Sequence, residues 1–138
     1  MKQTPGSIGY VELAYAHQNG LKVASVRNAA GQFVEPSVAS ITAAAEGALQ
    51  QLGPDSDYRI SIVNAPGATS YPISSLTWLL VYQKQADATK GKKLVDFMAW
   101  MYDKGQASAA PLDYAPLPAA LVTRLTKRLA TIQLGASP

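Results

Sequence analysis

The sequence predicts an α/β fold for this chain of 138 residues. Two observations support that prediction. In the first 70 residues, short stretches of alternating apolar residues are interleaved with stretches of helical periodicity, whereas from about residue 83 only helical patterns remain. Between the two parts lies the segment of residues 71–82, YPISSLTWLLVY, whose apolar end is typical of a strand buried on both faces. We interpret it as the strand that connects the two parts, although an ordinary core strand explains the local sequence equally well.

The composition is that of a globular protein with a real core. Hydrophobic residues make up 48% of the chain and charged residues 15%, which excludes an intrinsically disordered chain. The net charge is only +3. Its basic residues form two small groups at helical spacing, without the interleaved aromatic residues that a nucleic-acid surface uses: Lys90, Lys92 and Lys93, and Arg124, Lys127 and Arg128. We therefore expect no nucleic-acid partner.

Several classes of site and segment are excluded by what the sequence lacks. There is no cysteine, so disulfides, thiolate metal sites and cysteine nucleophiles are ruled out, and the redox compartment stays undetermined. No apolar run approaches the roughly 18 residues of a membrane span. The first residues, MKQTPGSIGYVE, lack the apolar core of a signal peptide, so we expect no export signal in this chain.

In the first part, turn residues and periodicity predict four strands and two helices. The first helix covers residues 12–19 and ends at Gly20, and the second covers residues 38–52. The second helix starts at Ser37 or at the Glu35-Pro36 pair, and Gly53-Pro54 ends it. The expected strands are residues 8–11, 22–27, 33–34 and 58–63, with a turn at residues 28–31 and a loop of turn formers at residues 64–70.

The second part is predicted to be helical. One helix covers residues 90–104 and faces inward with Leu94, Phe97, Met98 and Met101. A helical turn at residues 106–110 and a proline-containing connector at residues 111–118 follow. Pro118 suits the first position of a last helix over residues 119–134.

The residues that could carry out catalysis are few. His17 is the sole histidine, which excludes a multi-histidine metal site, and its polar surroundings predict a solvated helix residue. Neither a Walker-type loop nor a GxGxxG or GxSxG motif occurs, and the nine carboxylates show no spacing of a paired site. We therefore expect a protein that is not an enzyme and that uses no cofactor or metal.

Hydroxyl residues near glycines and strand edges are the more suggestive group. With backbone N–H groups, such hydroxyls can hold an oxyanion. From spacing alone, ordinary turn and edge chemistry is the better explanation. The residues are Ser7, Ser70, Ser74, Ser75 and Thr77.

Five ordered segments carry a resemblance to a known family. They are TPGSIGYVELAYAHQNGL, VRNAAGQFVEPSVASI, YPISSLTWLLVYQ, LVDFMAWMYDKGQ and LDYAPLP. Together they closely resemble successive segments of the periplasmic phosphate-binding proteins, the solute receptors of phosphate ABC importers. The resemblance covers the chain from residue 2 to about residue 134 and implies a type 2 periplasmic-binding-protein fold.

The resemblance is to the C-terminal part of that family. Full members are longer and have two α/β lobes that close over phosphate. Their main phosphate-contacting motifs lie upstream: a Thr/Ser-containing loop, an aspartate of the first lobe, and a stretch ending in Ser-Gly-Thr-Thr. None of these occurs here, and Arg27 and Arg59 do not occupy the family's arginine position. The resemblance therefore implies no confident ligand-binding residue, and leaves Ser7, Ser74, Ser75 and Thr77 as weak cleft-side candidates.

The resemblance also implies an organisation of the chain. Residues 1–70 would form part of the second lobe, residues 71–82 would be a hinge-crossing strand, and residues 83–138 would be a helical segment packed on the first lobe. Inorganic phosphate and the membrane subunits of an ABC importer would be partners of the intact protein, in the periplasm or at the cell surface.

A partial lobe exposes strand edges and helix faces that the rest of the protein would cover. We therefore predict that the chain by itself forms a homo-oligomer, for instance by a domain swap of the C-terminal helices, or is marginally stable. The alternative function is a self-associating structural or interaction module that binds no anion of its own.

Overall fold

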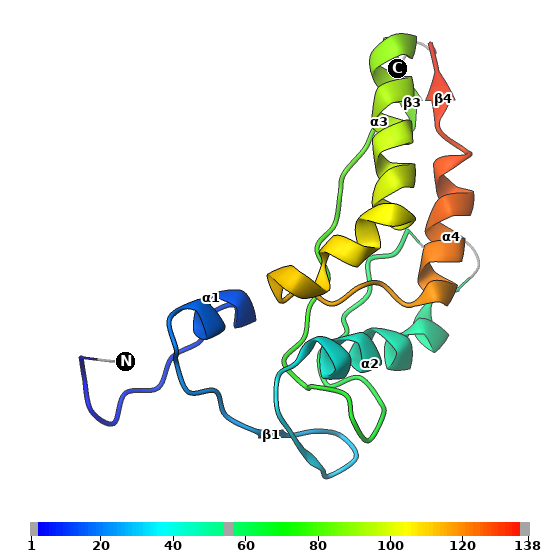
Figure 1. Ribbon diagram of the computed structural model, residues 1–138. Coiled ribbons are helices and arrows are strands. Elements are labelled where there is room, and N and C mark those ends of the chain that lie inside the picture. Colours follow the sequence, from blue (N-terminus) through cyan, green and yellow to red (C-terminus); the bar gives the residue numbers. More distant parts are fainter. Residues whose placement is uncertain (1–2, 54–56, 136–138) are drawn as a thin grey trace.

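The computed structural model describes residues 3–53 and 57–135. Figure 1 shows a lower part that contains the N-terminal helices and an upper part made of two long helices. In chain order the elements are α1 (Leu13–Gln18), β1 (Val26–Arg27), β2 (Phe33–Val34), α2 (Val38–Ala48), η1 (Leu49–Gln51), β3 (Lys84–Gln85), α3 (Ala88–Tyr102), η2 (Lys104–Ser108), η3 (Ala110–Leu112), α4 (Ala119–Leu129) and β4 (Gln133–Leu134).

The packed core lies between α2 and the segment that follows it. Ser37 caps α2, because its hydroxyl accepts from the Ser40 amide at 3.1 Å while the Ser40 hydroxyl accepts from the Ser37 amide at 2.9 Å. Of the two predicted starts, Ser37 and the Glu35-Pro36 pair, the structure confirms Ser37. The buried core cluster consists of small residues of α2 and two residues of the following segment: Ala44, Ala45, Ala48, Ile62 and Ala65. The alanines let the chain approach α2 closely.

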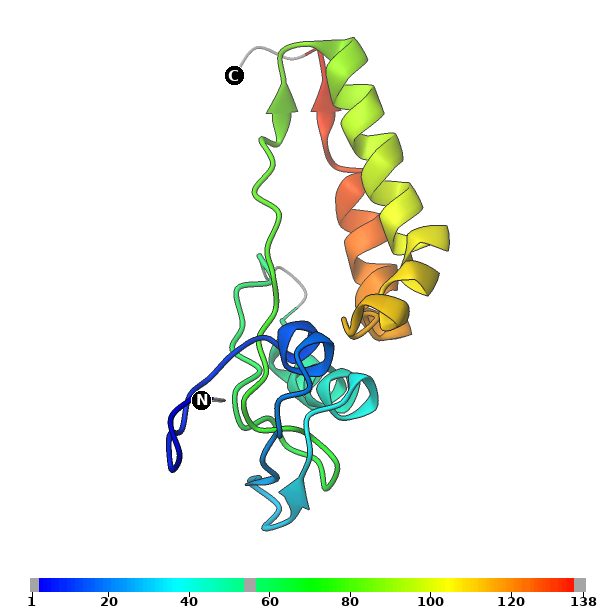
Figure 2. The ribbon, with the colours of Figure 1, turned by 60° about the vertical axis from the view of Figure 1, so that its left-hand side comes forward.

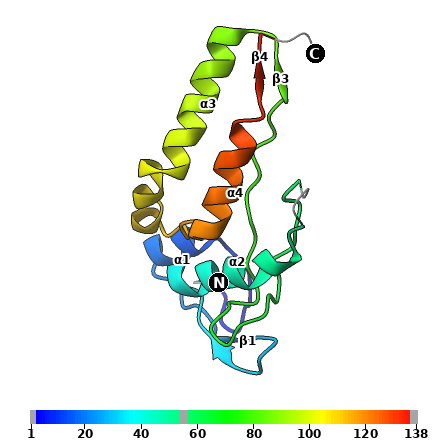
Figure 3. The ribbon, with the colours of Figure 1, turned by 90° about the vertical axis from the view of Figure 1, so that its right-hand side faces the viewer.

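The two long helices, α3 and α4, lie side by side (Figure 3). Asp87 caps α3 by accepting from the amides of Thr89 and Lys90, so the helix begins two residues earlier than predicted. Beyond α4 the chain turns into β4, which pairs parallel to β3 with Lys84 opposite Gln133. The expected helix over residues 119–134 is therefore too long, since its last residues form a strand that local periodicity did not indicate.

Most of the expected strands do not form within the described residues. Residues 8–11 and 58–63 have no strand assignment, and of residues 22–27 only Val26–Arg27 pairs, with β2. Residues 71–82 run extended without a partner strand (Figure 2), and the prediction of burial on both faces is wrong: Leu80 is 94% exposed and Tyr82 84%. A strand satisfies its backbone only beside another strand. Residues 58–64 lie beside this segment, where the Asn64 amide donates to the Pro72 carbonyl and Trp78 Nε1 donates to the Tyr58 carbonyl, but these described residues form no strand pairing with it.

The predicted short strand at residues 33–34 and the turn before it are confirmed. Arg27 pairs with Phe33, and the amide of Gly31 donates to the carbonyl of Asn28 across the turn. Among the described residues, no helix combines the length and apolar character needed to cross a membrane.

Candidate functional site

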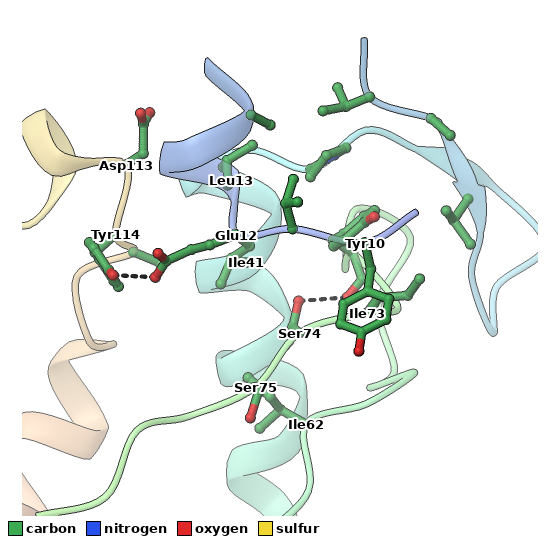
Figure 4. A pocket seen from close by; sticks show the side chains of 18 of the residues that line it. Tyr10, Glu12, Leu13, Ile41, Ile62, Ile73, Ser74, Ser75, Asp113 and Tyr114 are labelled. Atoms are coloured by element: carbon green, nitrogen blue, oxygen red, sulfur yellow. Dashed lines mark hydrogen bonds between the residues drawn. The ribbon is translucent and has the colours of Figure 1, made fainter. Parts of the chain in front are cut away.

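The four hydroxyl candidates line one cavity of about 770 Å³. The cavity is open and lies between the N-terminal segment, α2, the extended segment after residue 70, and the connector before α4 (Figure 4). The structure thus brings Ser7, Ser74, Ser75 and Thr77 to the same cavity although the first two lie 67 positions apart in the sequence.

Three of these hydroxyls are engaged in local hydrogen bonds. Ser74 Oγ donates to the carbonyl of Tyr71 at 2.9 Å and is buried, and Ser75 Oγ donates to the carbonyl of Leu76 at 3.2 Å. Ser7 Oγ donates to the carbonyl of Thr4 at 2.8 Å. These are the turn and edge roles that the spacing favoured. Ser70, the fifth hydroxyl, is buried outside the cavity and donates to the carbonyl of Pro66 at 3.0 Å.

The cavity walls do not suit a phosphate dianion. Ile41, Ile62 and Ile73 supply apolar surface, and the charged residues among the described lining are Glu12, Lys22 and Asp113. Two carboxylates against one ammonium repel an anion, and an oxyanion needs several converging donors. The described residues therefore do not form a complete oxyanion site.

A pair of long-range polar contacts joins α1 to the connector at the rim of this cavity, and we call this pair the clasp. The Tyr114 hydroxyl donates to the Glu12 carboxylate, which raises the pKa of Tyr114 (Figure 4). His17 Nδ1 lies 2.9 Å from Asp113 Oδ1. His17 is half-exposed, as its polar surroundings predicted, but sequence reasoning missed its partner because 96 positions separate the two residues.

Arg27 and Arg59, the two arginines considered in the sequence analysis, do not line this cavity. Arg27 Nε donates to the carbonyl of Gly31 at 3.4 Å. Arg59 pairs with Asp57 at 2.5 Å, and this hydrogen bond lowers the pKa of Asp57 and raises the pKa of Arg59. No group of three or more metal-ligating side chains occurs within residues 3–53 and 57–135.

A second cavity of about 800 Å³ separates the extended segment from α3 and α4. Trp78 and Leu80 line one side, and Met98 and Leu121 line the other. Its described lining is mainly apolar, and Asp57 and Arg128 are its charged residues, so it offers apolar packing surface rather than a set of converging polar ligand groups.

Asn28 is a buried polar residue that the sequence analysis placed in a turn but did not single out as a site residue. Its side-chain amide nitrogen donates to the carbonyls of Gly67, Ala68 and Ser70 at 3.0–3.1 Å, and its oxygen accepts from the amides of Ala30 and Gln32. Asn28 thereby fixes the loop that leads into the extended segment. An asparagine in a predicted turn indicates a side chain that bonds nearby backbone groups, but the turn does not identify its distant partners in residues 67–70.

Residues 1–104 match the family model described as the PBP superfamily domain. That match covers most of the chain, so the chain belongs to this superfamily. The mixed helices and small sheets agree with a partial α/β lobe of that fold, which confirms the expected fold class.

More specific relatives are curated proteins named phosphate-binding protein PstS. The one from Xylella fastidiosa (strain 9a5c) is 41% identical over 91% of this chain and 34% of its own length. The one from Pasteurella multocida (strain Pm70) is 39% identical over 86% of this chain and 34% of its length. The one from Haemophilus influenzae (strain ATCC 51907 / DSM 11121 / KW20 / Rd) is 36% identical over 95% of this chain and 39% of its length. The chain thus spans about a third of the curated relatives it matches. These relatives are named for binding rather than catalysis, in agreement with the expected family of binding proteins rather than enzymes.

Proposed function

We propose that the chain is the C-terminal segment of a phosphate-binding solute receptor for ABC-type import, and that the intact protein binds inorganic phosphate non-covalently. The observation that carries the proposal is the 41% identity to a phosphate-binding protein over 91% of the chain. The apolar cavities and the incomplete set of donors agree with a segment that needs the remaining two thirds of its relatives' length.

The proposed mechanism assigns each part of the chain a place in a two-lobed receptor. Residues 1–70 belong to the second lobe, residues 71–82 cross the hinge, and residues 83–138 pack on the first lobe. Ser7, Ser74, Ser75 and Thr77 are the cleft-side residues of this proposal, in which hydrogen bonds to phosphate replace the local ones that the Ser7, Ser74 and Ser75 hydroxyls now donate. Closure of the lobes excludes water and strengthens these charge-assisted hydrogen bonds.

The proposal includes the partners and location of the intact receptor. A phosphate receptor for an ABC importer delivers its ligand to the membrane subunits of the importer, so it works in the periplasm or at the cell surface.

A chimera tests the proposal. In it, this chain replaces the matching third of the Xylella fastidiosa relative, and calorimetric titration with inorganic phosphate is compared with the same titration of the isolated chain. We expect binding by the chimera and no heat from the isolated chain, since the latter lacks a complete donor set. A chimera that folds, by circular dichroism, yet gives no heat would contradict the proposal.

Hydroxyl variants in the chimera test the cleft-side residues. A lost hydrogen bond to a charged ligand costs about 1.5–3 kcal/mol, so Ser75→Ala or Thr77→Ala should weaken phosphate binding about tenfold or more. Ser108→Ala in η2 is the matched control, because Ser108 is exposed and lines neither cavity. Equal affinities for all three variants would remove Ser75 and Thr77 from the cleft.

We also propose that the isolated chain self-associates into a homo-oligomer, with a swap of the C-terminal helices as the arrangement that the sequence suggested. The observation in favour is the exposure of large apolar side chains in extended segments, including Ile8 and Tyr10 at 99% and Leu80 at 94%. Light scattering on the eluting peak of a size-exclusion column measures the mass. A stable, well-folded monomer would refute self-association.

A further inference from the structure

Asn19 and Gly20, at the end of α1, form the only Asn-Gly pair in the sequence, since Asn28 and Asn64 are each followed by alanine. In an Asn-Gly pair the backbone nitrogen of the glycine can attack the side-chain carbonyl carbon of the asparagine, because glycine has no side chain that shields this nitrogen. Both residues are exposed, and a Cβ atom on Gly20 would meet nothing within 4 Å. The pair is therefore accessible to a spontaneous modification.

The modification is deamidation, and its sole co-reactants are water and hydroxide. Hydroxide takes the amide proton of Gly20, and the freed nitrogen bonds to Asn19 Cγ. The bond between Cγ and Nδ2 breaks, and ammonia leaves with a proton from water, which regenerates the hydroxide. Water then opens the resulting imide ring. Opening at Cγ gives aspartate, whereas opening at the backbone carbonyl carbon gives isoaspartate, in which the main chain runs through Cγ.

The last turn of α1 holds both reacting groups in hydrogen bonds. The Gly20 amide donates to the His17 carbonyl at 3.0 Å, and Asn19 Nδ2 donates to the Tyr15 carbonyl at 2.9 Å. Removal of the Gly20 proton requires the first hydrogen bond to break. Approach of Cγ to the Gly20 nitrogen requires the Asn19 side chain to leave the Tyr15 carbonyl. The pair therefore reacts when this turn opens, and it is protected while the turn is closed.

Helix α1 depends on contacts with the rest of the chain to stay closed. A helix of six residues is too short to be stable by itself, and α1 buries two alanine side chains. The clasp ties both of its ends to the connector: the Tyr114 hydroxyl donates to Glu12 before the first turn, and His17 in the last turn contacts Asp113 (Figure 4). Loss of the clasp should therefore let the last turn open more often.

We propose that Asn19 is the deamidation site of this chain, and that the clasp controls the rate by holding the last turn of α1 closed. The product carries a new negative charge at the C-terminal end of the helix, where the helix dipole disfavours it. Isoaspartate also lengthens the backbone, so the hydrogen bonds of this turn do not re-form in the same geometry. Because Leu13 and Ala16 of α1 line the cavity of the hydroxyl candidates, the modification irreversibly loosens one wall of that cavity.

Tryptic mapping by mass spectrometry tests the site, because cleavage places the three asparagines on different peptides: residues 3–22, 28–59 and 60–84. The chain is incubated at one pH and temperature, folded and in concentrated guanidinium chloride. Aspartate and isoaspartate products have the same mass and separate by chromatography. In guanidinium chloride we expect conversion at Asn19 far ahead of Asn28 and Asn64. In the folded chain we expect conversion at Asn19 to be about tenfold slower, because the opened fraction alone reacts.

Tyr114→Phe tests the control by the clasp, because it removes the hydroxyl that donates to Glu12 and leaves the sequence of α1 unchanged. The rate at Asn19 should rise about threefold in the folded variant, as expected for the loss of one exposed polar contact, and should stay unchanged in guanidinium chloride. Tyr82→Phe is the matched control, since Tyr82 is 84% exposed and lies outside α1 and the connector.

Three outcomes would overturn the proposal. Equal rates at the three asparagines in guanidinium chloride would remove Asn19 as the site. Equal rates at Asn19 in the folded and unfolded chain would show that α1 gives no protection. Equal folded-state rates for Tyr114→Phe and Tyr82→Phe would show that the clasp does not control the reaction.

Discussion

The loop of residues 64–70 and the extended segment of residues 73–82, called the arm here, are close in sequence but differ in their hydrogen bonding. The loop is rich in turn formers, and four of its carbonyls accept side-chain hydrogen bonds: Asn28 donates to three of them, and the Ser70 hydroxyl donates to the carbonyl of Pro66. The arm is apolar and has a strong strand pattern, yet none of its backbone N–H groups donates to an acceptor among the described residues, and Leu79, Leu80 and Tyr82 are exposed. A turn closes on itself and on its close neighbours, whereas a strand depends on a second strand that its own sequence does not specify.

The largest effect that would test this contrast is expected in the core beside the loop. Ile62 is 1% exposed in the cluster against α2, so Ile62→Ala should lower the free energy of unfolding by about 3 kcal/mol. Leu80→Ala in the arm should change it by less than about 0.5 kcal/mol, since that side chain is exposed. Urea unfolding at one fixed protein concentration measures both, and equal losses would mean that the arm is as well packed as the core.

The next effect concerns how closely the loop approaches α2. A Cβ atom on Gly47 would lie 2.0 Å from the carbonyl oxygen of Pro66, so Gly47→Ala should cost about 2 kcal/mol despite the better helix propensity of alanine. Gly53→Ala is the control, because a Cβ there meets nothing within 4 Å. A neutral Gly47→Ala would show that the loop can move away from the helix freely.

The same contrast explains how much of the structure the sequence could predict. Ser37 was one of the two starts predicted for α2, and it could be read from the sequence because a helix cap is a contact between residues three positions apart. The strands at residues 8–11, 58–63 and 71–82 were predicted from sound patterns, but strand pairing is non-local and the described residues do not supply the partners. At the candidate site, the hydroxyl residues were identified from turn chemistry, whereas their common cavity, the Asn28 contacts and the clasp depend on the tertiary fold.

A smaller effect is expected at the clasp, which joins two regions far apart in sequence. The contact between His17 and Asp113 is partly solvated, so a double-mutant cycle with His17→Ala and Asp113→Ala should give a coupling of about 0.5 kcal/mol. The single variants alone do not isolate the contact, because each also changes solvation and the connector backbone. Strict additivity of the two substitutions would show that the contact does not form in solution.

The smallest effect on stability is expected at Tyr71, which lies between the hydrogen-bonded loop of residues 64–70 and the arm. Burial raises the pKa of Tyr71 above its ordinary value of about 10, because an ionised phenolate is poorly solvated there. The folded state therefore holds this proton more tightly than the unfolded state. The resulting stability is fully present below about pH 10 and is lost as pH rises through the folded pKa. Urea midpoints between pH 9 and pH 11 should fall less steeply for Tyr71→Phe than for the unmodified chain, with part of the decline remaining because burial also raises the pKa of Tyr102. Identical slopes would mean that the Tyr71 side chain is solvated. The change from buried to exposed side chains along the chain would then lie before residue 71.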